Sequence, residues 1–375
     1  MRLRASRLLV TLISPLILTA CSGGYVSTRI RSAGGSRTGK SVVVTPARYV
    51  GTSTCIECHS DEGKACLASP HMRTLRLMNR ADLGTLAPDV GSIPKGRTAL
   101  VLDPQTGRYA ARVTGQGGRS YPLQLAFGSG KHGITYVEIR GNRVGEYRWT
   151  YFPKLKEWHT TPGSEDLPPG AFGDVRTPSN SRDCIGCHTI SVSQNQLMPR
   201  ASFFGVGCEA CHGPGSNHVS AMQVGESQKP SIADLSGWTA ERLNEMCGKC
   251  HGTAQNLGVP IPTPMLTSRF QPYGLMLSRC FLEGGQTLSC ITCHDPHEKA
   301  SSDLRHYEKV CLSCHSPAAE HAQYPLPSGA IRGKTCPVNP VSGCISCHMP
   351  ENRVFPDTTI KMTMPDHWIH VPRKG

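Results

Sequence analysis

Two stretches of the chain alternate apolar and polar positions. They cover residues 98–113 and 136–149 and run through turn sequences at Asp103-Pro104 and Gly141-Asn142. A period of two residues on both sides of a turn predicts a β-hairpin for each stretch. We therefore predict a small antiparallel β insert at about residues 97–155, and we expect it to be the only β-rich part of the chain.

From Cys184 onward the sequence predicts helices separated by loops. Thr239 and Ser302 each open a segment with an N-cap residue and an acidic first turn, and Pro-rich links such as residues 259–264 separate the helices. Both predicted helices end in a Cys-x-x-Cys-His sequence. The predicted fold class is therefore mainly α and irregular, apart from the β insert.

The N-terminus has the pattern of an exported protein. Basic residues precede an apolar segment at residues 8–20, which is too short to span a membrane and predicts a secretory signal peptide. The ending Leu-Thr-Ala-Cys21 resembles the lipobox of bacterial lipoproteins, which implies cleavage before Cys21 and lipidation of its thiol. Ser22 at the next position suits sorting to the outer membrane. The alternative is ordinary signal cleavage that leaves Cys21 as a free thiol.

One five-residue sequence, Cys-x-x-Cys-His, occurs seven times. On one helical turn its first Cys and its His lie at i and i+4, with the second Cys beside them. Two thioether bonds can then hold the edge of a porphyrin while the imidazole binds the iron, so the sequence predicts seven covalently bound haem c groups. The predicted attachment residues are Cys55, Cys58, His59, Cys184, Cys187, His188, Cys208, Cys211, His212, Cys247, Cys250, His251, Cys290, Cys293, His294, Cys311, Cys314, His315, Cys344, Cys347 and His348.

Zinc is the alternative cofactor, because paired Cys-x-x-Cys units and His also bind it. Zinc binding does not explain why every Cys-x-x-Cys pair is followed immediately by His, so haem is favoured over zinc and over a disulfide framework. Of the 18 Cys residues, the 14 in the motifs and Cys21 leave Cys66, Cys280 and Cys336. Three thiols form at most one internal disulfide, whose partners the sequence does not choose.

Each predicted iron needs a sixth ligand, and nine histidines lie outside the motifs. A histidine just after its own motif cannot turn back to the opposite haem face, so His218 and His297 are expected to bind neighbouring irons. We favour iron ligation for His71, His132, His218, His297 and His367. Surface or packing roles are favoured for His159, His306, His321 and His370. Methionines are alternative ligands, although packing is their more typical role: Met72, Met198, Met349, Met362 and Met364.

The chain divides into three predicted parts. Residues 1–20 form the lipoprotein signal peptide, and the polar, Gly/Ser-rich residues 21–48 form a flexible tether. Residues 49–375 form a single heptahaem domain that contains the β insert. Because one motif falls on average every ~54 residues, we expect this domain to wrap around a chain of haems rather than to pack helix on helix.

The basic charge does not indicate nucleic-acid binding. The formal net charge of +13 falls to +10 when Arg2, Arg4 and Arg7 leave with the signal peptide. Seven haems add 14 propionates, offset by one positive charge per ferric bis-His iron, so +10 − 7 leaves about +3. We expect no nucleic-acid partner. An exposed basic face that docks an acidic redox partner is an open alternative.

Several passages resemble the multihaem cytochromes c related to the tetrahaem electron acceptor of hydroxylamine oxidoreductase. They are Tyr49-Val-Gly to Ser69-Pro-His71, Gly207-Cys-Glu-Ala-Cys-His-Gly-Pro-Gly215, Ser289-Cys-Ile-Thr-Cys-His-Asp-Pro-His297 and Cys344-Ile-Ser-Cys-His-Met-Pro350. More narrowly, four passages resemble heptahaem modules that are often fused to tetratricopeptide repeats. These are Gly128-Ser-Gly-Lys-His132, Trp158-His-Thr-Thr-Pro-Gly163, Ser278-Arg-Cys-Phe281 and Met364-Pro-Asp-His-Trp-Ile369.

The resemblance covers roughly residues 49–370 and implies a multihaem fold. It also implies a set of distal iron ligands, namely His71, His132, His218, His297 and His367. Two features depart from the family. No tetratricopeptide array follows the domain, and the Cys-x-x-Cys-Lys motif of the related pentahaem nitrite reductases is missing, which puts nitrite reduction in doubt.

The sequence as a whole predicts a lipid-anchored heptahaem cytochrome that carries electrons in an exported respiratory pathway. Its expected location is the periplasmic side or the cell surface, on the outer membrane, with other cytochromes or quinol-linked complexes as redox partners. No catalytic residue is assigned. One alternative is an oxidoreductase with an open haem for a small nitrogen or sulfur compound, at Cys247–His251, where no distal His is evident. A third reading is a subunit of an extracellular cytochrome assembly.

Overall fold

In the computed structural model the described residues are 46–78, 93, 98–102, 107–113, 118–193, 195–225, 231–258 and 261–371. They belong to one unit, residues 46–375. The predicted signal peptide, Cys21 and the predicted tether up to residue 45 lie outside the described residues. Within the described ranges, no helix is long and apolar enough to cross a membrane.

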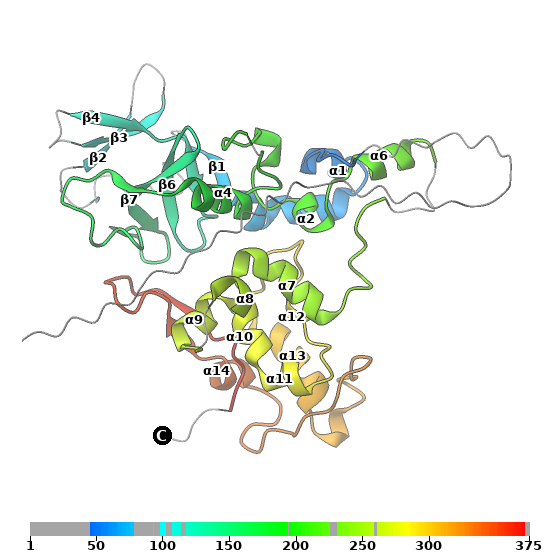
Figure 1. The fold of residues 1–375 in the computed structure, drawn as a ribbon. Helices are drawn as coiled ribbons and strands as arrows, with labels where there is room; N and C mark the ends of the chain where they lie inside the picture. The colour runs from blue at the N-terminus through cyan, green and yellow to red at the C-terminus, as the bar shows by residue number, and fades with distance from the viewer. Residues whose placement is uncertain are drawn as a thin grey trace, which may run out of the picture. The chain divides into compact units, whose positions relative to one another are not determined.

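Most strands belong to two antiparallel sheets (Figure 1). The larger sheet contains, in spatial order, β1 (Leu75–Leu77), β5 (Leu125–Phe127), β6 (Ile134–Arg140), β7 (Arg143–Phe152) and β8 (Glu157–Thr160), and β9 (Gly173–Val175) also pairs with β7. The smaller sheet contains β2 (Thr98–Leu102), β3 (Tyr109–Val113) and β4 (Arg119–Pro122). Both predicted hairpins are confirmed. In the first, Thr98 pairs with Val113, and in the second Gly141 and Asn142 form the turn between β6 and β7.

The predicted limits of the β insert, residues 97–155, are too narrow. The larger sheet starts at Leu75 and ends at Val175. The insert is also not the only β structure, because β10 (Glu351–Arg353) pairs with β11 (Thr363–Pro365). The strands β1, β9, β10 and β11 are each three residues long, which is too short for an alternating pattern to be recognised.

The larger sheet is covered on both faces. Tyr136 and Val137 are consecutive in β6, so their side chains point to opposite faces, and they belong to different buried clusters. Tyr136 packs in the cluster that contains Val113 of the smaller sheet. Val137 packs in the cluster that contains Ile185 of α4 (Pro178–Cys187). The sheet therefore supports the helix that carries the second Cys-x-x-Cys-His sequence.

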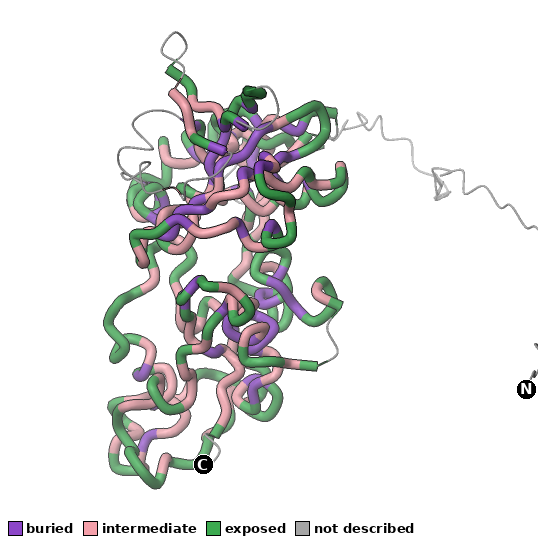
Figure 2. The backbone as a smooth tube through the Cα atoms, turned by 90° about the vertical axis from the view of Figure 1, so that its left-hand side faces the viewer, coloured by how far each residue is buried: buried purple, intermediate pink, exposed green. Residues whose placement is uncertain are grey.

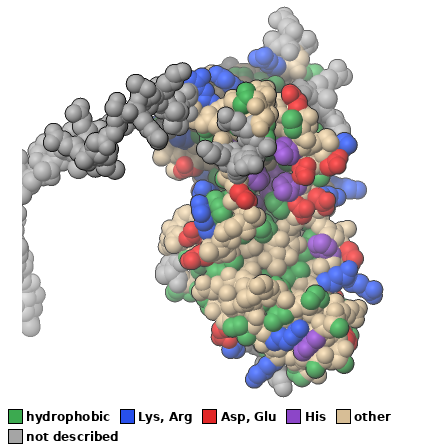
Figure 3. All heavy atoms as spheres, turned by 90° about the vertical axis from the view of Figure 1, so that its right-hand side faces the viewer, with side chains coloured by type: hydrophobic (Ala, Val, Ile, Leu, Met, Phe, Trp, Pro, Cys, Tyr) green, Lys and Arg blue, Asp and Glu red, His purple; other side chains and the backbone are tan. Residues whose placement is uncertain are grey.

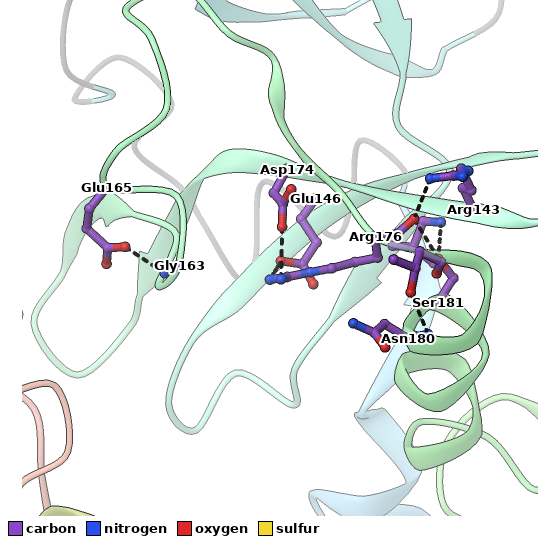
Figure 4. Close-up of polar contacts among 10 residues, drawn as sticks. Arg143, Glu146, Gly163, Glu165, Asp174, Arg176, Asn180 and Ser181 are labelled. Atoms are coloured by element: carbon purple, nitrogen blue, oxygen red, sulfur yellow. Dashed lines mark hydrogen bonds and ion pairs between the residues drawn. The ribbon is translucent and has the colours of Figure 1, made fainter. Parts of the chain in front are cut away.

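Polar contacts fix α4 against this sheet (Figure 4). The hydroxyl of Ser181 accepts a hydrogen bond of 2.8 Å from the backbone N–H of Val144 in β7. Arg176, which precedes the helix, forms ion pairs of 2.7 Å with Glu146 and 2.8 Å with Asp174. The hydrogen bond that Arg176 donates to Glu146 raises the pKa of Arg176. These contacts join β7, β9 and the start of α4.

Outside the sheets the chain forms short helices and loops (Figure 1). In the part of the chain that the structure describes, the other α-helices are α1 (Thr52–Ile56), α2 (Ser60–Ala68), α5 (Cys208–His212), α6 (Ser216–Gln223), α7 (Ala240–His251), α8 (Ala254–Leu257), α9 (Pro264–Arg269), α10 (Gln271–Leu277), α11 (Arg279–Glu283), α12 (Cys290–Cys293), α13 (Leu304–His315) and α14 (Cys344–His348), with 3₁₀ turns η1 (His71–Arg73), η3 (Ala201–Phe203) and η4 (Ala318–Glu320). The two predicted helices are confirmed as α7 and α13. Thr239 caps α7 as expected, whereas Asp303 rather than Ser302 caps α13.

Buried residues concentrate in the β structure (Figure 2). The largest fully buried side chains include Tyr136, Tyr147 and Phe152, all of them on strands of the larger sheet. In the described residues after α4, most positions are intermediate or exposed. Such short helices with little core of their own are compatible with a domain whose apolar mass comes from bound cofactors, and the wrapping of the chain around haem stays a prediction.

Candidate functional site

The seven Cys-x-x-Cys-His sequences are numbered as sites 1 to 7 in chain order. Their first cysteines are Cys55, Cys184, Cys208, Cys247, Cys290, Cys311 and Cys344. In every site the first Cys lies in a helix. In sites 1 and 5 the backbone N–H of the His donates to the carbonyl of the first Cys, at 3.0 Å and 2.9 Å. The helical turn therefore brings the ends of the motif together, as attachment of one porphyrin requires.

Four motif histidines lie opposite a histidine from another part of the chain. The distances between the paired ring centres fall between 6.1 and 6.5 Å, and the angles between the ring planes between 14° and 69°. The pairs are His59 with His218 (site 1), His212 with His297 (site 3), His251 with His71 (site 4) and His294 with His367 (site 5).

These distances fit an iron ion between the two rings. A metal–imidazole bond is about 2 Å long and the coordinating nitrogen lies about 1 Å from the ring centre, so two ligands on opposite sides of one metal have centres about 6 Å apart. The residues present therefore fit a haem at sites 1, 3, 4 and 5.

The paired histidines connect sites that are distant in the sequence. His218, shortly after site 3, lies opposite His59 of site 1. His297, shortly after site 5, lies opposite the histidine of site 3. His71, shortly after site 1, lies opposite His251 of site 4. Each of these three histidines thus faces a site other than the one it follows.

In several motif histidines, a hydrogen bond at one ring nitrogen determines which nitrogen is left to bind a metal. In four sites the Nδ1 atom lies 2.8 to 3.1 Å from a backbone carbonyl oxygen. The pairs are His188 with Thr74, His212 with Ala233, His315 with Lys334 and His348 with His370. An Nδ1–H that donates to a carbonyl leaves Nε2 unprotonated and available to a metal.

Burial favours the neutral imidazole, which is the form that binds a metal, in four of the eight paired histidines. It lowers the pKa of His71, His251 and His294. The pKa of His367 is lowered by burial to about 4. Burial, together with the nearby charges of Lys154 and Lys131, also lowers the pKa of His132 to about 4.

Three motif histidines face no second histidine ring among the described residues: His188, His315 and His348. The ring of His188 instead stacks on Phe127, with ring centres 4.6 Å apart. The Nδ1 atom of His132 is buried and has no hydrogen-bond partner in the described structure. None of the histidine ring pairs of the described residues includes His132. Ligation of an iron by His132 stays a prediction.

The remaining histidines have other surroundings. The ring of His159 contacts Glu157 at 2.8 Å and Thr359 at 3.2 Å. His306 lies edge-on against Tyr307, and His370 contacts the carbonyl of Trp368 through Nδ1. On the face drawn in Figure 3, histidine side chains reach the surface among Lys, Arg, Asp and Glu side chains of both charges.

The thiols of different sites are in contact. Four pairs of cysteines from different sites lie next to each other, namely Cys55 and Cys208, Cys187 and Cys250, Cys247 and Cys290, and Cys311 and Cys344. Site 1 therefore adjoins site 3, site 2 adjoins site 4, site 4 adjoins site 5 and site 6 adjoins site 7. Cys211 of site 3 also lies within electrostatic range of Cys247 of site 4. Site 4 is thus the place where sites 2, 3 and 5 meet.

Among the described residues, three cysteines lie outside the motifs, and all three are free thiols; no disulfide joins the described cysteines. Cys66 is buried and contacts Cys208 of site 3. Cys280 lies close to Cys293 of site 5, and burial raises the pKa of the Cys280 thiol. The sulfur of Cys336 accepts a hydrogen bond of 3.5 Å from a backbone N–H.

Gly333 packs against the imidazole of His315 in site 6, so Gly333→Ala should disturb that site. An added Cβ would overlap the ring, which would then leave its hydrogen bond to Lys334. We expect the free energy of unfolding, measured by thermal unfolding, to fall by about 1–3 kcal/mol. The spectroscopic signal of site 6 should also change. Gly237→Ala is the control, because open space surrounds the added Cβ there. An unchanged unfolding midpoint in G333A would contradict the packing of Gly333 on the ring.

Comparisons with known proteins identify similar sequences. The family model "Cytochrome c554 and c-prime" matches residues 148–213, which include sites 2 and 3. Cytochrome c-554 of Nitrosomonas europaea is 33% identical over 84 residues, covering 20% of this chain and 36% of that protein. The multiheme cytochrome MtrA of Shewanella baltica is 22% identical over 190 residues, covering 46% of this chain and 54% of that protein. The chain thus spans about half the length, or less, of these curated relatives.

Two solved structures are similar to this chain. The outer cell wall cytochrome OcwA has a TM-score of 0.49 and 16% identity, with coverage of 86% of this chain and 79% of that chain. The undecaheme cytochrome from the S-layer of Carboxydothermus ferrireducens has a TM-score of 0.45 and 16% identity, with coverage of 88% of this chain and 53% of that chain.

Proposed function

Since this chain is a multihaem c-type cytochrome, we propose that it transfers electrons through seven haem c groups attached at sites 1 to 7. The haem supplies an iron that takes up and releases one electron at a time. The role of the polypeptide is to hold these groups covalently, to supply their axial ligands and to place them side by side. The observation that carries the proposal is the set of four histidine pairs 6.1 to 6.5 Å apart.

The proposed ligands follow from these pairs. The motif histidines are the proximal ligands, and His218, His297, His71 and His367 are the distal ligands of sites 1, 3, 4 and 5. Two imidazoles per iron leave no open coordination position, which suits electron transfer rather than substrate binding. The buried, neutral state of His71, His251 and His367 supports this assignment.

The contacts between sites support an electron path with a junction. Thiol contacts connect site 4 to site 2 and to site 5, and Cys211 of site 3 lies near Cys247 of site 4. Site 1 joins through site 3, and sites 6 and 7 adjoin each other. We therefore propose that electrons entering at site 2 or at site 1 reach site 5 by way of site 4.

An oxidoreductase with an open site is the second candidate function. Site 4 was the expected open site, but the ring of His71 lies 6.1 Å from that of His251, which supports His71 as its distal ligand. His188, His315 and His348 face no histidine ring among the described residues, and this favours an open coordination position at site 2, 6 or 7. A small nitrogen or sulfur compound would bind at one of these three sites.

The cellular setting is proposed from the sequence. The apolar segment at residues 8–20 and the lipobox ending at Cys21 support export and a lipid anchor, with the outer membrane as the proposed location. Residues 21–48 would then tether the domain to the lipid. Other cytochromes or quinol-linked complexes are the proposed redox partners. Assembly into an extracellular cytochrome complex is the remaining alternative.

The test is a count of haems and of their spin states in the purified protein. Intact-mass and pyridine haemochrome measurements should give seven haems per chain, one for each motif. Low-temperature EPR of the oxidised protein should show low-spin ferric haem for at least the four sites with histidine pairs.

The outcome of that measurement separates the two candidate functions. Uniformly low-spin haem that is unaffected by nitrite or hydroxylamine supports an electron carrier. A high-spin signal that shifts when either compound is added supports the oxidoreductase, at site 2, 6 or 7. Fewer than four low-spin haems would contradict the ligand assignment itself.

A further inference from the structure

Glu209 lies inside the Cys-x-x-Cys-His sequence of site 3, yet its contacts are with other segments. It is 1% exposed, which is unusual for a carboxylate at a position where the motif allows any residue. The carboxylate accepts hydrogen bonds from the backbone N–H groups of Val50 at 2.9 Å, Gly51 at 2.7 Å and Gly215 at 2.8 Å. Both oxygens are used, because Gly51 donates to Oε2 and Gly215 to Oε1.

The three donors belong to the two halves of site 1. Gly51 is the N-cap of α1, the helix that carries Cys55 of site 1. Gly215 is the N-cap of α6, the helix that carries His218. The ring of His218 lies 6.3 Å from that of His59. One carboxylate therefore holds both the segment that begins site 1 and the segment that supplies its proposed distal ligand.

Neighbouring contacts reinforce this link. The backbone N–H of Arg48 donates to the hydroxyl of Ser216 at 2.8 Å, and the N–H of Ser216 donates to the carbonyl of Arg48 at 3.1 Å. A Cβ added to Gly215 would lie 3.4 Å from Oε1 of Glu209 and 3.5 Å from Val50. The two segments thus pack closely around the carboxylate, and water has little room to replace it.

The chemistry explains why a carboxylate is needed. A buried charge is unfavourable unless several donors compensate it, and bonds to an ionised acceptor are stronger than neutral ones. A glutamine side chain has one acceptor oxygen and one NH2 group. After the substitution Glu209→Gln, the NH2 group would therefore face the backbone N–H of either Gly51 or Gly215. Alanine would leave all three N–H groups buried without partners.

We propose that Glu209 is the positioning residue of site 1, which fixes His218 opposite His59. This inference rests on the proposed function, because it takes His59 and His218 as the two axial ligands of one iron. Glu209 touches neither ring in this role and acts through the backbone at Gly51 and Gly215. Its loss should free His218 from site 1 while the covalent attachment at Cys55 and Cys58 stays intact.

The test uses the full-length holoprotein with Glu209→Gln, Glu209→Ala and His218→Ala. Glu57→Gln is the matched control, since Glu57 also lies inside a Cys-x-x-Cys-His sequence but is exposed. We expect seven haems by mass in each variant, but one low-spin ferric haem per chain converted to high spin in the Glu209 variants and in H218A. Added imidazole should restore the low-spin signal in each of them, and E57Q should match the wild type.

The outcomes separate this inference from the proposed function. If H218A itself remains low-spin, the assignment of His218 as a ligand is wrong. If H218A becomes high-spin while E209Q and E209A do not, the positioning role of Glu209 is overturned. Combining E209Q with H218A should give no more high-spin haem than H218A alone, and an additive effect would place the influence of Glu209 at another site. Should E209A fail to accumulate, E209Q, which keeps the side-chain shape, decides.

Discussion

Replacing His71 by alanine should convert site 4 from a low-spin to a high-spin centre. The ring of His71 lies 6.1 Å from that of His251, and a methyl group at the same position cannot reach an iron between them. Burial lowers the pKa of His71, which favours the neutral imidazole that can bind a metal. EPR of the oxidised H71A protein should show one new high-spin signal per chain, and added imidazole should remove it.

His159→Ala is the control for this experiment. Its ring contacts the side chains of Glu157 and Thr359 and lies opposite no motif histidine in the described structure, so the spectrum should not change. A low-spin site 4 in H71A would mean that another side chain binds the iron there. A high-spin site 4 in the unmodified protein would instead restore site 4 as the candidate for substrate binding.

The attachment sites could be predicted from the sequence because all their information is local. Five consecutive residues contain both thiols and the imidazole, and one helical turn brings them together. The distal side is different, since it depends on which distant segments fold against each site. The sequence excluded a return of His218 and His297 to their own sites, and the structure places them opposite His59 and His212.

The histidine pair at site 4 could not be predicted from the sequence. His71 and His251 are 180 residues apart (251 − 71), and no periodic pattern connects them. Their approach depends on how the segment after site 1 packs, including a hydrogen bond from His71 to the backbone of Pro296. The role of Glu209 was missed for a related reason, because its partners Val50 and Gly51 lie nearly 160 residues earlier, with sequence separations of 159 and 158.

Helices and strands could be predicted from the sequence where a segment was long enough to show a periodic pattern of apolar residues. The β6–β7 hairpin and the helices α7 and α13 were recognised for that reason. The strand β1 was not, since its three residues pair with β5 about fifty residues later, as in the pair of Leu75 with Phe127. Phe127 is the last residue of β5, and its ring stacks on His188 of site 2.

Removing both thiols of site 4, by Cys247→Ala with Cys250→Ala, should have the largest effect on electron transfer. Thiol contacts of the described residues join site 2 and site 5 to site 4, and Cys211 of site 3 lies close by. The variant should contain one haem fewer by mass. We expect haem reduction by a limiting amount of reductant, monitored by stopped-flow absorbance, to split into two phases. The slower phase should be at least about tenfold slower than reduction of the wild type, which corresponds to about 1.4 kcal/mol in the barrier.

The matched control removes a haem that lies outside the proposed junction. Cys344→Ala with Cys347→Ala deletes the attachment of site 7, whose described thiol contact is with Cys311 of site 6. It should also lose one haem, but the remaining haems should be reduced in a single phase at nearly the wild-type rate. If both variants behave alike, the effect follows from losing any haem and site 4 is no junction. If only the site 4 variant becomes biphasic, the contacts at Cys247 and Cys250 determine how electrons pass between the two ends of the chain.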